Sequence, residues 1–316
     1  MKDRKIIFKS FKGSHLYGTN HAKSDHDYGG VFLNSASDLL GLEKRPDLWN
    51  NSIKVSTTVK NSKDDVDDEL KSLPNFLYLC ATGDSGCIES LFTPKEKTLV
   101  HTEEWDLILK NRDWLVTQKI RRPFLDYSKA QAYKAVSKVT NLNLLKEFVD
   151  FFSTQNPRLR IRDVFPESLK NKIEMKTLTD GVLAFELGGK THLMSLKVSQ
   201  FLKVISQQYN QFGHRVQSAS QVGYDAKSLA HAYRTLFEAE ELLTTGYLTL
   251  PLPEDKITFL KSVLNREFVP DTNFSHYNEY SEKVKALNNN LLPESVDMGK
   301  LNKLCESIMF DYFKVK

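Results

Sequence analysis

The stretch GSHLYGTNHAKSDHDYGG, residues 13–30, is the most informative part of this sequence. Short apolar runs flank it, KIIFKSF at 5–11 and GVFL at 30–33, and both predict buried strands. If the second strand begins at residue 25, Asp25 and Asp27 project from the same face, because side chains alternate along a strand. The sequence therefore predicts a Gly-Ser turn and a pair of carboxylates between two strands.

These residues have the chemistry that phosphoryl or nucleotidyl transfer needs. Two neighbouring carboxylates repel each other unless a cation lies between them, and a set of oxygen ligands suits Mg²⁺ or Mn²⁺. The backbone N–H groups of Gly13 and Ser14, with the serine hydroxyl, can hold phosphate oxygens. Two metal ions would stabilise the attacking and leaving oxygens of an in-line displacement. Asp-x-Asp alone is common in solvated turns, so the prediction depends on its combination with the Gly-Ser turn.

The remainder of the chain predicts an α+β protein in two parts. Residues 1–110 form a small mixed-sheet catalytic head, and residues 111–316 form a mostly helical domain with a β-containing insertion near 155–190. In the head, a further strand is expected at 53–59 and two short helices in 73–92, separated by Gly-Asp-Ser-Gly. In the second part, helices are expected at 124–138, 193–212 and 226–245, and a strand at 182–187.

Composition sets broad limits on the type of protein. The 316 residues include 44 Lys and Arg and 40 Asp and Glu, a net charge of +4 that permits contact with a polyanion without requiring it. Three cysteines without a CxxC pair favour a reducing compartment. We find no apolar run long enough for a transmembrane helix and no signal peptide, so a cytoplasmic protein is expected.

Four segments resemble one known family. GSHLYGTNHAKSDHDYGGVFL (13–33) resembles the signature of the DNA polymerase beta nucleotidyltransferase superfamily, in the bacterial and phage branch of predicted nucleotidyltransferases associated with RNA repair. LLGLEK (39–44), LPNFLYLCATGDSGCIESLF (73–92) and GYDAKSLAHAYRTLFEAEELLTTG (223–246) resemble further motifs of that branch, in the same order. Asp84-Ser85 stands where the branch usually has Asn-Pro. The match leaves about 140–215 unexplained.

The resemblance implies a third carboxylate on a later strand. The candidates are Asp67, Asp68 and Glu69. Counted back from Leu73, Asp67 falls where the family tends to have an acid, and Glu69 is the alternative on the same face. In this interpretation Asp25, Asp27 and Asp67 are the catalytic carboxylates and metal ligands.

A second group of candidates lies on the predicted helix 226–245. Lys227, His231 and Arg234 follow the spacing i, i+4, i+7, which places them on one helix face. Such a face is commonly a solvated basic surface, but the resemblance includes all three residues and implies contacts with nucleotide phosphates or the acceptor. Glu89 is a further candidate site residue of the same kind. In the alternative interpretation it is a helix-face carboxylate that pairs with a neighbouring lysine.

The expected activity is transfer of a nucleoside monophosphate from an NTP to an acceptor hydroxyl, with release of pyrophosphate. The basic clusters and the family branch favour the 3′ end of RNA or tRNA as acceptor. Arg158, Arg160 and Arg162 alternate with apolar residues and suggest a strand edge that suits a nucleic-acid backbone, although such edge charges are usually solvated. Two alternatives remain: an AMP-transferase that modifies Tyr, Ser or Thr of a protein, and a non-catalytic nucleotide-binding regulator.

Overall fold

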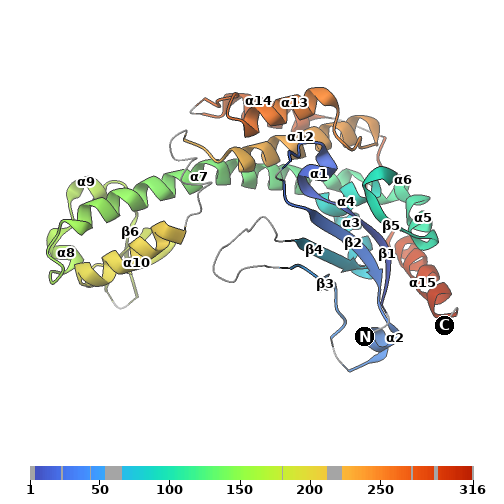
Figure 1. Cartoon of the computed structure of the whole chain (residues 1–316), viewed down its shortest axis with the longest axis horizontal. Coiled ribbons are helices and arrows are strands. Elements are labelled where there is room, and N and C mark those ends of the chain that lie inside the picture. The colour runs from blue at the N-terminus through green and yellow to red at the C-terminus, as the bar shows by residue number, and fades with distance from the viewer. Residues whose placement is uncertain are drawn as a thin grey trace. The chain divides into compact units, whose positions relative to one another are not determined.

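The computed structural model describes residues 4–22, 24–42, 44–53, 66–179, 181–211, 223–271, 273–287 and 291–314 (Figure 1). Contacts between Cα atoms divide the chain into two compact units. Unit 1 contains Met1–Ala130 and Ala230–Lys316, and unit 2 contains Gln131–Leu229. The predicted α+β class is confirmed. The strand expected at 53–59 lies outside the described residues except for its first residue, Ile53, which forms an isolated bridge with Val66.

Unit 1 is built on a mixed five-stranded sheet with the order β3-β4-β2-β1-β5. Its strands are β1 (Lys5–Phe11), β2 (Asp27–Leu33), β3 (Leu48–Asn50), β4 (Asp67–Ser72) and β5 (Thr98–His101). β2 and β4 are parallel, and the other neighbours are antiparallel. The first predicted strand is confirmed. The second begins at Asp27, so the expectation that Asp25 also belongs to it is wrong, and Asp25 lies in the preceding loop.

Helices complete unit 1, and local capping explains where the first of them begin and end. The helices wholly within unit 1 are α1 (Gly13–Tyr17), α2 (Ala36–Leu40), α3 (Leu73–Thr82), α4 (Ser85–Leu91), α5 (Glu103–Leu109), α6 (Arg112–Leu115), α13 (Glu254–Leu264), α14 (Ser275–Ala286) and α15 (Met298–Lys314), with 3₁₀ turns at Lys95–Lys97 and Gln118–Ile120. The Ser72 side chain accepts from Asn75 N at the start of α3, and Gly83 ends it at φ 84°. Asp84 then caps α4 by accepting from Cys87 N. The predicted break between two helices is confirmed.

The composition of unit 1 differs from the division predicted near residue 110. The C-terminal helix α15 contacts α3 and α5, so the end of the chain packs on the N-terminal head. Two helices, α7 (Arg121–Ser153) and α12 (Ala226–Thr245), have residues in both units. Sequence periodicity reports which face of a helix is apolar but not which helix will cover it.

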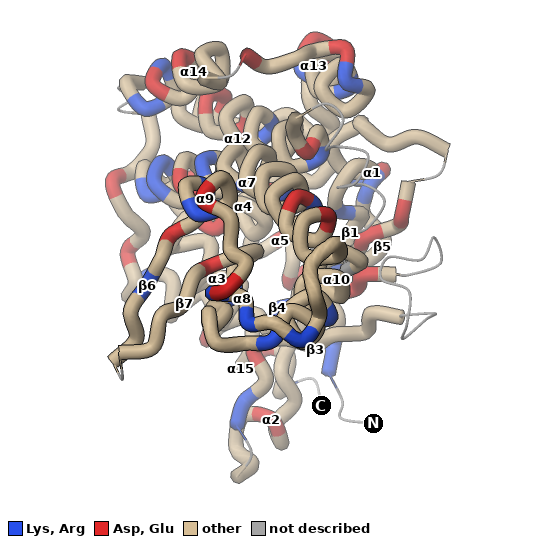
Figure 2. Tube along the Cα trace, turned by 90° about the vertical axis from the view of Figure 1, so that its left-hand side faces the viewer, with Lys and Arg blue, Asp and Glu red and all other residues tan. Residues whose placement is uncertain are grey.

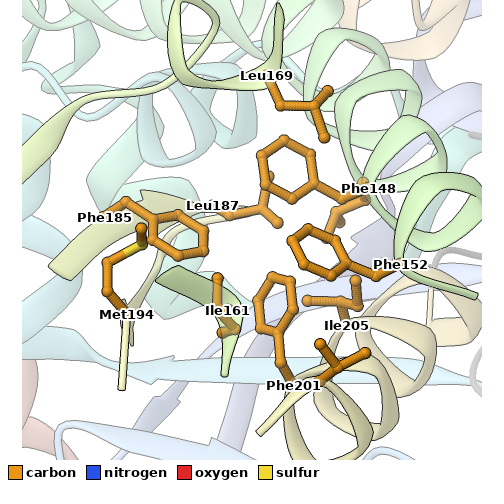
Figure 3. Close-up of a cluster of buried hydrophobic side chains, with 11 residues drawn as sticks. Phe148, Phe152, Ile161, Leu169, Phe185, Leu187, Met194, Phe201 and Ile205 are labelled. Atoms are coloured by element: carbon orange, nitrogen blue, oxygen red, sulfur yellow. The ribbon is translucent and has the colours of Figure 1, made fainter. Parts of the chain in front are cut away.

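Unit 2 has its own aromatic core. It contains α8 (Ile161–Val164), α9 (Glu167–Lys170), α10 (Val198–Gln211) and a three-stranded sheet of β6 (Met175–Thr177), β7 (Leu183–Leu187) and β8 (Lys190–Leu193). Phe148, Phe152, Phe185 and Phe201 meet in this core, which Figure 3 shows. The predicted strand at 182–187 is confirmed as β7.

One expectation for unit 2 is wrong. Arg158, Arg160 and Arg162 do not share a strand edge, because α8 begins at Ile161 and only Arg160 forms a bridge, with Lys197. Among the helices that the structure describes in either unit, none combines the length and apolar character needed to cross a membrane.

Candidate active site

The Gly-Ser turn lies directly against Asp27. Lys12 N donates to Asp27 O at 2.8 Å, which joins the end of β1 to the start of β2. Gly13 has φ 59°, and a Cβ on it would lie 2.7 Å from Asp27 Oδ2. A glycine therefore permits both the left-handed backbone and the close approach of the carboxylate. Ser14 follows in α1, and its predicted contact with phosphate stays a prediction.

Asp27 and Asp67 occupy equivalent positions on neighbouring strands. They are register partners in the parallel pair β2–β4, and Gly29 and Glu69 are the next partners on the same face. Neighbouring strands are about 4.8 Å apart, so the two carboxylate side chains project side by side from the same face of the sheet. Asp67 is exposed and Asp27 is partly buried.

The other two candidates for the third carboxylate have different surroundings. Asp68 is buried on the opposite face, where its Oδ2 accepts from Lys9 Nζ at 2.8 Å. Glu69 shares the face of Asp67, but its Oε1 accepts from Lys71 Nζ at 3.0 Å. The geometry thus favours Asp67 as the partner of Asp27, with Glu69 as the alternative.

The Asp27–Asp67 pair suits a magnesium ion in its donor chemistry. Mg²⁺ is usually held by one or two carboxylates together with waters and substrate phosphates. Asp25 is exposed in the loop before β2, and across the described residues no three His, Cys, Asp or Glu side chains converge closely enough to form a complete metal site. The pair therefore fits a metal shared with substrate, while ligation by Asp25 stays a prediction.

A pocket of about 280 Å³ opens on this face of the sheet. Gly29 and Glu69 line it, two residues along their strands from Asp27 and Asp67. Lys12, Gly86 and Arg234 contribute further walls. Small-molecule pockets commonly measure about 300–1,000 Å³, so this one suits part of a nucleotide.

Lys12 is a cation of this pocket that sequence reasoning missed. Its Nζ donates to Ser90 Oγ at 2.6 Å and to Gly86 O at 3.2 Å. Burial lowers the pKa of Lys12, while Glu89 nearby partly opposes that effect. A Cβ on Gly29 would lie 2.9 Å from Lys12 Cε, so the bare glycine leaves room for the lysine side chain. The signal was present in the sequence as a lysine directly before Gly13-Ser14.

Glu89 and Arg234 form the centre of a buried ionic cluster. Arg234 Nη1 donates to Glu89 Oε1 at 2.6 Å and to both carboxylate oxygens of Glu238 at 2.7 Å. Tyr17 OH donates to Glu89 Oε2 at 2.8 Å, and the guanidinium lies 4.2 Å from the centre of the Tyr17 ring. Burial raises the pKa of Glu238 to about 8, with Arg234 opposing and Glu89 reinforcing the shift. The cluster therefore joins α1, α4 and α12.

The three cations predicted on α12 are thus in different settings. Arg234 lines the pocket and is held by two carboxylates. His231 is partly buried, and Lys227 is exposed in the first turn of the helix. Neither His231 nor Lys227 is among the described residues that line the pocket. Their contacts with a nucleotide stay predictions. The expected helix, with Asp225 before it and Gly246 after it, is confirmed as α12.

Comparison with known proteins supports the resemblance. Residues 1–148 match a family model described as RNA repair pathway DNA polymerase beta family. The chain is also similar to an uncharacterized 38.9 kDa protein in the nrdC-mobD intergenic region of Enterobacteria phage T4, with 27% identity over 274 residues, covering 79% of this chain and 80% of the phage protein. No solved structure matches. The range matched by the family model, residues 1–148, contains Gly13, Asp27, Asp67 and Glu89.

Proposed function

We propose that the protein is a metal-dependent nucleotidyltransferase, because residues 1–148 match the model of the RNA repair pathway DNA polymerase beta family. It transfers a nucleoside monophosphate from an NTP to the 3′ hydroxyl of an RNA and releases pyrophosphate. The observation that carries the proposal is the Asp27–Asp67 register pair beside the turn at Gly13. The free, unpaired cysteines favour a reducing, cytoplasmic setting.

Each residue of the site has a role in this reaction. Gly13 and Ser14 hold the β- and γ-phosphates through backbone N–H groups and the hydroxyl. Asp25, Asp27 and Asp67 would hold Mg²⁺ or Mn²⁺, which supplies charge neutralisation for the phosphates when bound. Asp67 orients the acceptor hydroxyl and receives its proton. The hydroxyl oxygen bonds to the α-phosphorus, and the bond between the α-phosphorus and the bridging oxygen breaks.

The buried cations support the same reaction. Lys12 directly follows β1, next to Gly13, and offers positive charge in the pocket. Arg234 holds Glu89 and hence α4, which contributes to the pocket lining. Lys227 and His231 are proposed as further contacts with the nucleotide or the acceptor.

The test is incorporation of labelled nucleotide from each of four α-labelled NTPs, with Mg²⁺ or Mn²⁺ and total RNA. We expect wild-type protein to label RNA, and Asp27→Asn and Asp67→Asn to lose at least a hundredfold in rate. The comparison variant is Glu69→Gln, which removes the alternative third carboxylate, an exposed acid on the same strand and face as Asp67. If Glu69→Gln abolishes transfer and Asp67→Asn does not, Glu69 is the third carboxylate.

The same experiment separates the alternatives. Label that appears on Tyr, Ser or Thr of added proteins instead of RNA would identify a protein AMP-transferase. Mg²⁺-dependent NTP binding without any transfer, measured by calorimetry, would indicate a nucleotide-binding regulator. Either outcome would contradict RNA as the acceptor.

A further inference from the structure

Positive charge is concentrated in unit 2. Residues 131–229 contain 14 Lys and Arg against 8 Asp and Glu, whereas the rest of the chain contains 30 against 32. The modest net charge of the whole protein is therefore the sum of a positive net charge on unit 2 and a slightly negative one on unit 1. A basic unit attached to a slightly acidic one indicates that unit 2 is the part that meets a polyanion.

Four of these cations gather on one short paired segment. Residues 158–162 run antiparallel to residues 194–198, with Val198 N donating to Leu159 O and Ile161 N to Leu196 O, both at 2.9 Å. Arg160 and Lys197 are directly opposite each other in this pairing. We call Arg158, Arg160, Arg162 and Lys197 the basic patch, and all four are exposed. Figure 2 shows blue Lys and Arg positions on the tube beside α8.

Among the residues that the structure describes, few acidic side chains pair with the basic patch. Elsewhere in unit 2, Lys170, Lys172 and Lys176 lie 3.1, 2.6 and 2.7 Å from Glu167, Glu147 and Glu186, respectively. The acid adjoining the patch is Asp163, which lies 3.6 Å from Arg162 Nε and also accepts from the backbone N of Arg160.

Like charges placed opposite each other destabilise a strand pair. The Arg160–Lys197 pairing brings two positive side chains onto opposite positions, and a bound anion would offset their repulsion. Between these cations lies Leu159, whose side chain is 40% exposed and offers an apolar contact.

We propose that the basic patch binds the phosphodiester backbone of the RNA acceptor. This inference rests on the proposed function, since it assigns the acceptor of that reaction to a surface of unit 2. Guanidinium groups bind phosphate oxygens bidentately, and the neighbouring Leu159 suits the face of a ribose or base. The contact is with the backbone, so it is largely independent of sequence.

The test compares two triple variants with the same loss of charge. Arg158→Gln/Arg162→Gln/Lys197→Gln removes three patch cations and keeps Arg160, whose Nη1 donates to Ser195 O at 2.8 Å. Lys170→Gln/Lys172→Gln/Lys176→Gln is the matched control in the same unit. Binding of a labelled single-stranded RNA is measured by fluorescence anisotropy from 50 to 200 mM salt, and thermal melts verify folding.

We expect the patch variant to bind RNA at least tenfold more weakly, with the slope of log K against log salt reduced by roughly 2, because each phosphate contact on a single strand contributes about 0.7. The control variant should change little. In the transfer assay the patch variant should raise KM for RNA and leave KM for the NTP unchanged.

Two results would overturn the inference. One is equal weakening by both triple variants, which would indicate a diffuse charge effect. The other is patch-dependent binding to anionic lipid vesicles without patch-dependent binding to RNA. Failure of the proposed function looks different, because RNA would still bind through the patch while no variant or wild-type protein transferred nucleotide.

Discussion

Arg234 Nη1 lies 2.6 Å from Glu89 Oε1, and the two residues are 145 positions apart in the chain. Both side chains are buried, as is Glu238, the second acid on the same guanidinium. One cation thus faces two carboxylates, and a raised pKa for Glu238 allows one carboxyl to keep its proton. The contact attaches α4, which forms part of the pocket wall, to α12.

Removal of the arginine should be costly for stability. We expect Arg234→Met to lower the free energy of unfolding by about 3–5 kcal/mol, because it leaves two carboxyl groups buried without their cation. Urea unfolding followed by circular dichroism measures the change. Arg122→Met is the control, since Arg122 is exposed and pairs with the exposed Asp126 at 3.4 Å. An Arg234 variant as stable as that control would contradict the buried cluster.

Glu238 should make stability depend on pH. Its pKa rises from an ordinary value of 4.5 to about 8 on folding, so between these values the folded state binds more protons than the unfolded state. The contribution of Glu238 to the free energy of unfolding is therefore fully present below about pH 4.5 and decreases as the pH rises toward 8. Glu238→Gln should flatten the unfolding free energy between pH 5 and 8. If the free energy of unfolding changed with pH equally in the variant and the wild type, a group other than Glu238 would be responsible.

Gly13→Ala should reduce catalysis more than stability. The new Cβ would lie 2.7 Å from Asp27 Oδ2, and the φ of 59° is unfavourable for alanine. We expect about 1 kcal/mol of lost stability, from backbone strain, and a hundredfold fall in transfer rate, from displacement of the carboxylate. Gly189→Ala is a matched control, with φ 75° and open space around the added atom. It should lose similar stability and keep its transfer rate.

His192 should destabilise unit 2 in acid. Burial lowers its pKa, and its ring lies 5.1 Å from that of Phe201 in the aromatic core. The unfolded state therefore gains a proton first, and stability from the neutral ring is lost as pH falls below about 6.5. Hydrogen exchange of amides in α10 at pH 7 and pH 5 measures this, with His192→Phe expected to remove the difference. Equal protection of wild-type α10 at both pH values would contradict it.

Local signals made much of the fold predictable. The strand at 5–11, the break at Gly83 and the limits of α12 each depend on a few neighbouring residues. The family resemblance pointed to Asp67 as a third carboxylate, but its register pairing with Asp27 was not predicted and is seen only in the structure. The start of β2 was predicted two residues too early, because Asp25 and Asp27 suit a loop as well as a strand.

Long-range contacts account for what was missed. The placement of Lys12 depends on Gly29 of the next strand, and Glu89 was predicted without its partners Arg234 on α12 and Tyr17 on α1. The packing of α15 on α3 joins segments more than 200 residues apart and has no local signature. Arg158 to Arg162 alternate as a strand would, but pairing with 194–198 ends at a helix.

The discontinuity of unit 1 has a consequence for biosynthesis. On a ribosome, Glu89 emerges long before Arg234, and α3 and α5 emerge before the helix that covers them. A nascent chain that has reached residue 148 already contains Asp27, Asp67 and Glu89, yet it lacks Arg234 and α15. We expect such a fragment to be sensitive to protease, and catalytic competence to arise only after α15 has been synthesised.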